Sequence, residues 1–336
     1  MKVALYFESE KLIQTSGIGR AFYHQKMALE SAGVEYTTDT EDNFDILHIN
    51  TVGITSTSEI ESARKKGAKV IYHAHSTEED FRNSFILSNQ LAPFLRKHLI
   101  HLYSQADYII TPTAYSKKLL IDYGINVEIE DVSNGIDLNR FKYDEEKVKA
   151  FKNYFSIEDN QKVVISVGLY FERKGIQDFM EVAKYFPEIK FIWFGYTPMI
   201  SIPKSVRDLI HDHPRNVILP GYVKGPIIEG AYAAADCFFF PSYEETEGIV
   251  VLEALASKCP VLIRDIPVYE DWLVHNESCF KAHDNEGFVH IIRQIISGEN
   301  VDPRIKENGY EIAKARSIEE IGKKLKLIYE KVRGTV

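Results

Sequence analysis

Two glutamates, Glu245 and Glu253, stand in a segment where an apolar run ending at Phe240 passes through Gly248 into a second apolar run. This pattern predicts a strand followed by a helix. Such a turn presents unpaired backbone N–H groups and the positive end of the helix dipole, which suit a phosphate or a hydroxyl-rich ligand. One carboxylate falls on the turn and the other in the helix, so both can line one pocket. The alternative is that acidic residues merely stabilise a helix N-terminus, which leaves Glu253, inside an aliphatic run, unexplained.

A pair of cations follows an earlier candidate strand. Gly168 ends that strand, and Arg173, Lys174 and Gly175 precede a segment of helical period. Two cations directed into a cleft can neutralise a leaving diphosphate. The alternative is an exposed cation pair at a helix start. The glycines on both sides weaken it, because glycine lets the backbone approach a ligand closely.

A short glycine motif with Gly17, Gly19 and Arg20 follows the first candidate strand. On its own it is a weak signal that also fits a dinucleotide site. The third glycine of the dinucleotide pattern is absent, which disfavours a nicotinamide cofactor.

Two histidines, His73 and His75, end the third candidate strand, and alternation puts both on one face. Histidines at this spacing can bind a metal, but no third ligand is near them in the sequence. We therefore predict no metal site here, and a structural role stays open for both.

These motifs are positioned by short β-branched or aromatic runs that alternate with longer segments of helical period. The alternation is typical of βα units around parallel sheets, and it occurs twice. The predicted strands are 2–7, 45–50, 69–75, 108–112 and 127–132 in the first series and 163–167, 190–194, 217–219, 237–240 and 260–263 in the second.

The two series predict an α/β fold with two doubly wound, Rossmann-like domains that face each other across a cleft. We expect one domain in 1–150, a second domain in 151–315, and an amphipathic helix in 316–336 that packs back on the first domain. Ligands bind such folds at the C-terminal ends of strands and in the cleft. The motifs fall at those ends.

Composition narrows the classes of function. The 336 residues are 45% hydrophobic and carry a net charge of −9, so the chain can bury large cores but lacks the basic surface that nucleic-acid binding needs. No apolar run approaches the roughly 20 residues that span a bilayer, and no signal-peptide pattern is present, so we expect a cytoplasmic protein. Cys237, Cys259 and Cys279 lack metal or disulfide spacing and are expected to be buried small hydrophobes.

The segment 241–254 resembles the hallmark of the retaining glycosyltransferases of family 4, which is a Glu, seven residues and a second Glu on the two-domain GT-B fold. In that family the first Glu contacts hydroxyls of the donor sugar and the second holds the nucleotide ribose. The resemblance therefore implies these roles for Glu245 and Glu253.

The chain departs from the family pattern between the two glutamates. Thr246 and Glu247 precede Gly248 where Gly-Phe-Gly is common. The resemblance still implies donor binding by this turn, through Thr246, Glu247, Gly248 and Ile249. It does not explain a carboxylate at Glu247 near a diphosphate.

Other family positions are carried over residue by residue. Lys174 matches the family lysine, whereas Leu169 stands where an arginine is usual, so Arg173 is expected to supply that charge to the leaving group. The resemblance implies that His75 reaches the donor sugar. Further donor contacts are implied for Gly17, Gly19, Arg20, Gly168, Gly195 and Tyr222. The resemblance also implies that the domain in 1–150 binds the acceptor and that the domain in 151–315 binds the nucleotide-sugar donor.

The resemblance implies transfer of a hexose with retention, by attack on the face from which the nucleoside diphosphate leaves, without a metal or other cofactor. The expected donor is UDP-glucose or UDP-galactose. Local sequence near Tyr6, at 48–51 and at 168–175 is similar to that of bacterial enzymes that glycosylate diacylglycerol or monoglucosyl-diacylglycerol, as in lipoteichoic anchor synthesis. A lipid or glycolipid acceptor is therefore expected.

A membrane surface is a further expected partner. The segment 81–103 mixes aromatic residues with Arg and Lys, a composition that can lie on a bilayer, here the inner face of the plasma membrane. A helix that packs on the first sheet is the alternative.

Other functions fit parts of the same pattern. A family relative that acts on a soluble sugar or a cell-wall polysaccharide needs only a different cleft in the first domain. A nucleotide-sugar epimerase shares the fold but needs acid and base residues. A non-catalytic nucleotide-sugar-binding protein is the third alternative, given Leu169 and Glu247. The two-carboxylate chemistry of glycosidases is not indicated, because no acidic residue of the first half stands out as a nucleophile.

Overall fold

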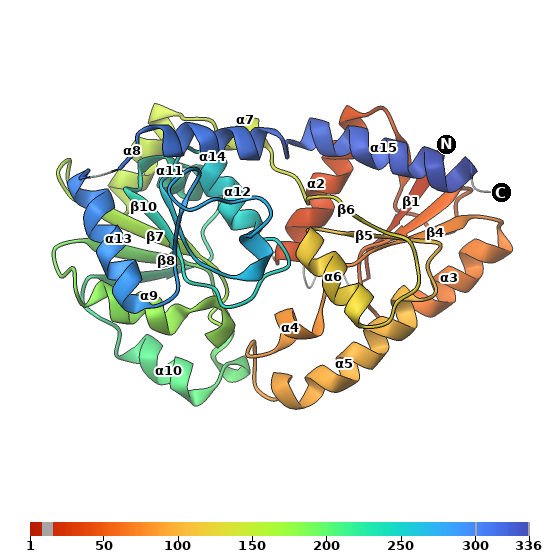
Figure 1. Cartoon of the computed structure of the whole chain (residues 1–336), viewed down its shortest axis with the longest axis horizontal. Coiled ribbons are helices and arrows are strands. Elements are labelled where there is room, and N and C mark those ends of the chain that lie inside the picture. Colours follow the sequence, from red (N-terminus) through yellow and green to blue (C-terminus); the bar gives the residue numbers. More distant parts are fainter. Residues whose placement is uncertain (9–15, 300, 335–336) are drawn as a thin grey trace.

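The computed structural model describes residues 1–8, 16–299 and 301–334. The described chain forms two parallel sheets of six strands, one in each half (Figure 1). The first sheet has the order β2-β1-β3-β4-β5-β6 and consists of β1 (Lys2–Tyr6), β2 (Glu35–Thr37), β3 (Ile46–Ile49), β4 (Lys69–His73), β5 (Tyr108–Thr111) and β6 (Ile129–Asp131). The second has the order β12-β11-β10-β7-β8-β9 and consists of β7 (Val163–Val167), β8 (Lys190–Phe194), β9 (Val217–Gly221), β10 (Cys237–Phe240), β11 (Val261–Arg264) and β12 (Phe280–Ala282).

Helices cover both faces of each sheet, so the central strands are largely buried and mostly apolar. In β10, Cys237 and Phe239 face one core while Phe238 and Phe240 face the other. The first half contains α2 (Gly17–Ser31), α3 (Ser56–Lys65), α4 (Glu78–Phe81), α5 (Ser88–Tyr103) and α6 (Ala114–Asp122). The second contains α7 (Leu138–Phe141), α8 (Glu145–Tyr154), η1 (Glu172–Lys174), α9 (Ile176–Ala183), η2 (Met199–Ser201), α10 (Lys204–His211), α11 (Pro226–Ala234), α12 (Ile249–Ala256), η3 (Pro267–Tyr269), α13 (Asn285–Ser297) and α14 (Arg304–Lys314).

The predicted fold class is confirmed, and all ten predicted strands are present with shifted ends at several. The short edge strands β2 and β12 were not predicted. Each has three residues and, among the described strands, pairs with a single neighbour, so neither carries a long apolar signal. The predicted domain boundary at residue 150 falls inside α8.

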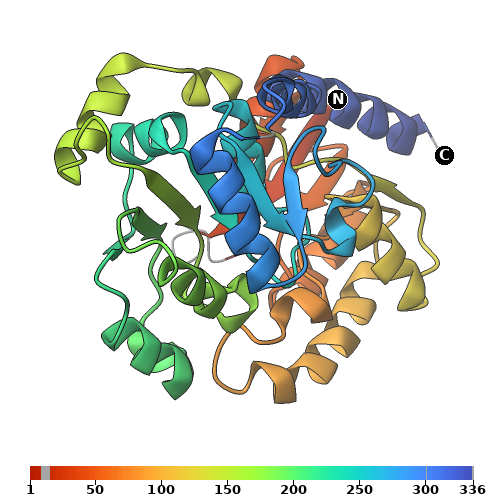
Figure 2. The same cartoon turned by 60° about the vertical axis from the view of Figure 1, so that its left-hand side comes forward.

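The last helix, α15 (Ile318–Gly334), packs on α2 of the first half, as expected (Figures 1 and 2). Ile321, Leu325 and Ile328 join the core on one face of the first sheet. A Cβ at Gly322 would lie 2.2 Å from Ala28 O, so glycine is needed for the two helices to approach this closely.

The chain crosses between the halves at two paired segments. Ile136 forms a parallel bridge with Ser317, with Ile136 N donating to Arg316 O at 3.0 Å and Ile318 N donating to Ile136 O at 3.1 Å. The outgoing and returning crossings therefore lie side by side.

Candidate functional site

The carboxyl ends of β7 and β10 are neighbours where the strand order of the second sheet reverses. Ligands of doubly wound sheets bind at such a point, because the two connections leave in opposite directions and open a crevice. Gly175 follows η1 with φ +74°, and a Cβ there would lie 2.3 Å from Pro241 O. Only glycine permits this contact, which brings the cation motif against the glutamate motif.

Lys174 and Glu245 form an ion pair at this contact. Lys174 Nζ lies 2.5 Å from Glu245 Oε1, and the Ser242 hydroxyl donates to the same oxygen at 2.7 Å. The two charged side chains are only 14% and 7% exposed. Burial lowers the pKa of Lys174, the charge of Arg173 lowers it further, and Glu245 opposes both effects. An anionic ligand would therefore meet a cation that is already held in place.

Arg173 points from the same turn toward the first half. Its guanidinium pairs with Asp80 of α4 at 2.8 Å, donates to Ser84 Oγ at 3.1 Å and donates to Glu244 O at 3.0 Å. Arg173 therefore joins the two halves in this structure. Its expected contact with a leaving diphosphate stays a prediction and requires some of these bonds to be exchanged.

Glu253 lies in α12 and is 5% exposed. The Tyr232 hydroxyl donates to Glu253 Oε2 at 2.7 Å, and Arg20 Nη1, from α2 of the first half, lies 3.2 Å from Oε1. The predicted second glutamate therefore has a partner in each half.

The turn before α12 is also held from the first half. The Thr246 carbonyl accepts hydrogen bonds from the first half, and Glu247 is 1% exposed and directed at Asn134. Gly248 has φ +85° and Ile249 begins the helix, so this turn ends at the N-terminal amides of α12.

The predicted glycines serve different local needs. A Cβ at Gly195, where φ is +138°, would lie 1.9 Å from Gly168 O, so these two glycines pack directly against each other at the ends of β8 and β7. Gly17 and Gly19 lie in the first turn of α2, where Ser16 Oγ accepts from Gly19 N at 3.2 Å. Tyr222 follows β9 and is 47% exposed, with Lys224 Nζ 5.5 Å from the centroid of its ring.

His75 is buried with its ring stacked on His73 at 4.0 Å between centroids, and its Nε2 lies 3.2 Å from Asn50 Oδ1. Burial lowers the pKa of His75 to about 3. A neutral imidazole is therefore present at neutral pH, which suits hydrogen bonding to a hydroxyl better than proton transfer. Its contact with a donor sugar stays a prediction.

Several residues that hold this site were not predicted, namely Asp80, Ser84, Thr113, Ser116 and Tyr232. Each is a single polar residue whose partner is distant in sequence. The spacing of nearby residues in the sequence does not predict such a contact. Asn134 was visible only as part of a turn.

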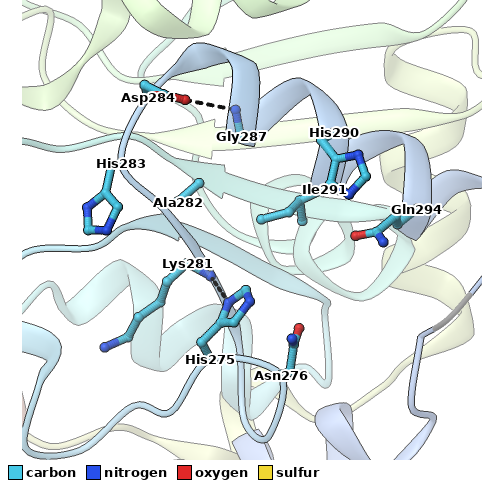
Figure 3. Close-up of a pocket in the computed structure, with 10 residues that line it drawn as sticks. All are labelled: His275, Asn276, Lys281, Ala282, His283, Asp284, Gly287, His290, Ile291 and Gln294. Carbon is cyan, nitrogen blue, oxygen red and sulfur yellow. Dashed lines mark hydrogen bonds between the residues drawn. The ribbon is translucent and has the colours of Figure 1, made fainter.

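A surface pocket lies elsewhere, between β12, the start of α13 and the turn at His275 (Figure 3). It is lined by His275, Lys281, His283 and His290 among others, and it shares no residue with the predicted site. Within residues 1–8, 16–299 and 301–334, no group of three His, Cys, Asp or Glu side chains is arranged to hold a metal ion.

In the same described ranges, no helix combines the length and the apolar character that crossing a membrane requires.

The three cysteines are buried and unpaired, as predicted.

Comparison with known proteins agrees with this geometry. Residues 17–140 match the family model "Glycosyltransferase Family 4", and residues 147–312 match "Glycosyl transferases group 1". The processive diacylglycerol alpha-glucosyltransferase of Acholeplasma laidlawii is 51% identical over 99% of this chain and 98% of its own length. The alpha-galactosylglucosyldiacylglycerol synthase of Streptococcus pneumoniae is 24% identical over 80% of this chain and 74% of its own.

Among solved structures, HepE of Anabaena in complex with UDP and glucose superposes with a TM-score of 0.81, at 15% identity, over 98% of this chain and 100% of that chain. This likeness identifies the GT-B arrangement of two facing Rossmann-like domains. Together with the identity over nearly the full chain, it shows that this protein belongs to the family 4 glycosyltransferases.

Proposed function

We propose that the chain is a retaining hexosyltransferase that moves glucose or galactose from a UDP-sugar to a lipid acceptor, diacylglycerol or monoglucosyl-diacylglycerol. The observation that carries this proposal is the 51% identity to a processive diacylglycerol alpha-glucosyltransferase over nearly all of both chains. The alpha product in the name of that relative supports retention, because UDP-hexoses carry the alpha configuration.

The donor is held by the crevice between β7 and β10. Glu245 orients the hydroxyls of the hexose, Glu253 binds the ribose, and Lys174 stabilises the negative charge that develops on the departing UDP. Arg173 adds a second cation when its bond to Asp80 is exchanged for the diphosphate. The buried Lys174–Glu245 pair, at 2.5 Å, supports this arrangement because it fixes a cation and a hydroxyl acceptor in one place.

The acceptor hydroxyl attacks from the face on which UDP leaves, so the configuration is retained. His75 donates or accepts a hydrogen bond with the hexose without changing its charge, since its pKa of about 3 keeps it neutral. The proposal requires no metal, because Lys174, Arg173 and the α12 amides supply the positive charge. Activity is expected to be unchanged by a chelator such as EDTA.

UDP as the nucleotide is supported by the solved structures of HepE, which hold UDP or UDP-glucose. These share only the fold with this chain, so the choice of nucleotide rests on the donor panel below.

Docking on the inner face of the plasma membrane completes the proposal. Segment 81–103 buries Leu99 and Leu102 in a core of the first sheet, while Leu91 and Phe94 on α5 are 47% and 70% exposed. One face of this amphipathic segment is thus already used by the protein. The other presents apolar side chains that a bilayer can cover.

The experiment is a transfer assay with UDP-glucose, UDP-galactose and a GDP-hexose, each offered with diacylglycerol, monoglucosyl-diacylglycerol and a soluble disaccharide. We expect transfer from one UDP-hexose to a lipid acceptor, with an alpha linkage by the anomeric proton coupling in NMR. Transfer only to the soluble sugar would favour the polysaccharide alternative. A beta linkage would refute retention.

A further inference from the structure

Thr246 and Glu247 turn their polar groups toward the first half of the chain. The Thr246 carbonyl accepts from Thr113 Oγ1 at 2.8 Å and from Ser116 Oγ at 3.0 Å. Glu247 Oε2 accepts from Asn134 N at 3.0 Å and from Asn134 Nδ2 at 2.7 Å. Two consecutive residues between the donor glutamates are therefore tied to the opposite domain.

Asn134 is itself firmly held. It is 7% exposed, and the next residue, Gly135, has φ +77° and accepts from His24 Nδ1 of α2 at 2.8 Å. Ile136 then pairs with the returning chain at Ser317. Glu247 is therefore hydrogen-bonded to the segment at which the two halves are joined.

We propose that Glu247 is a positioning residue that fixes the turn 245–248 against the first domain, so that Glu245 and the first amides of α12 face the UDP-sugar. This inference rests on the proposed function, because it assigns a role in the same donor site. Glu247 does not touch the donor. The positioning role explains why a carboxylate is compatible with a diphosphate nearby, because the Glu247 carboxylate faces Asn134 and not the donor.

The chemistry of the contact requires an acceptor at this position. Both Asn134 donors are buried and converge on one oxygen, and an apolar side chain in place of Glu247 would leave them unsatisfied. Burial raises the pKa of Glu247, and the Ser133 hydroxyl, the Asn134 bonds and the charge of Arg316 oppose this. Either protonation state keeps an oxygen that can accept.

The test compares Glu247→Gln, which keeps the acceptor, with Glu247→Leu, which removes it at similar volume. UDP affinity is measured by calorimetric titration, and kcat and KM are measured separately for UDP-sugar and for acceptor. We expect Glu247→Leu to weaken UDP binding about tenfold and to leave the acceptor KM unchanged. Glu247→Gln is expected to stay within about twofold of the parent.

Asn216→Leu is the matched control, because it removes three hydrogen bonds to backbone carbonyls before β9, at the end of the sheet opposite the donor turn. It should lower the melting temperature and leave UDP affinity unchanged. Asn134→Ala removes only the Nδ2 donor and is expected to weaken UDP binding less than Glu247→Leu does. If Glu247→Leu does not fold, the UDP affinity of Asn134→Ala is compared with that of the parent and the control instead.

Unchanged UDP affinity in both Glu247→Leu and Asn134→Ala would overturn the positioning role. So would a loss of affinity that follows the loss of melting temperature equally in Glu247→Leu and Asn216→Leu. Failure of the parent chain to bind UDP would instead overturn the proposed function. The first titration therefore separates the two failures.

Discussion

At the scale of single residues, each glutamate of the motif is matched by a cation. Glu245 pairs with Lys174 of its own half, and Glu253 pairs with Arg20 of the opposite half. A buried pair loses hydration on folding, and removing one partner leaves a charge without compensation. Single and double substitutions of Lys174 and Glu245 can therefore distinguish an effect on stability from an effect on activity.

Lys174→Met is expected to lose about 3 kcal/mol of stability, because Glu245 is left as a buried charge. Glu245→Gln should cost less, since the Lys174 side chain that it leaves behind is 14% exposed, against 7% for Glu245. The double variant should regain much of the stability that Lys174→Met loses. All three should lose about 100-fold or more in kcat if the proposed donor contacts are made, because each variant removes at least one of them.

Thermal unfolding and single-turnover transfer measure the two effects. A double variant that recovers activity along with stability would contradict the donor role of the pair.

Glu244 predicts a pH dependence. Burial raises its pKa to about 7, with Asp80, Glu245 and Glu79 adding to the effect and the Tyr115 hydroxyl opposing it. An unfolded glutamate titrates near about 4.3, so between these values the folded chain holds a proton that the unfolded chain releases. The contribution of Glu244 to stability therefore falls as the pH rises from about 4.3 toward 7.

Glu244→Gln stays neutral and should raise the melting temperature by about 2–4 °C at pH 8 while changing it little at pH 5. Glu270→Gln, an exposed site with the same change in charge, is the control. An equal shift at both pH values in Glu244→Gln would refute the assignment.

At the scale of elements, the sequence predicts strands correctly where apolar runs are continuous. It does not predict isolated contacts between residues that are far apart in the chain. β7, β8 and β10 were predicted with their observed bounds, because buried parallel strands are apolar on both faces. The glutamate and cation motifs were placed correctly at strand ends. The partners that hold them, such as Asp80 for Arg173 and Asn134 for Glu247, depend on how two domains meet, which local patterns do not encode.

The contact between α15 and α2 predicts the effect of one methyl group. Gly322→Ala places a Cβ about 2.2 Å from Ala28 O, so α15 must shift away and we expect a loss of about 2–4 kcal/mol. Gly334→Ala, at the open end of the same helix with no atom near its Cβ, should have little effect. Chemical denaturation measures both. Equal stability of the two variants would show that α15 is not fixed on α2.

At the scale of the whole molecule, α5 lies at one side of the protein and α15 at the other (Figure 1). Leu91 and Phe94 on α5 and Leu327 on α15 are all exposed apolar residues. If the proposed membrane face is α5, only the first two contribute to binding.

Leu91→Ser with Phe94→Ser should reduce co-sedimentation with vesicles of phosphatidylglycerol and phosphatidylcholine at least about tenfold, since burying each side chain contributes about 1.5–3 kcal/mol. Leu327→Ser is the matched control and should bind as the parent does. Equal binding of all three proteins would rule out α5 as the docking face.

The paired crossings at Ile136 and Ser317 have a mechanical consequence. Any swing of one half relative to the other turns about this double strand, so displacement grows with distance from it. Asn134 and Glu247, beside the pivot, move least, whereas the Asp80–Arg173 bond at α4, on the far side in Figure 1, moves most. A domain movement would therefore open and close the Asp80–Arg173 contact, while the contact between Glu247 and Asn134 would stay in place near the hinge.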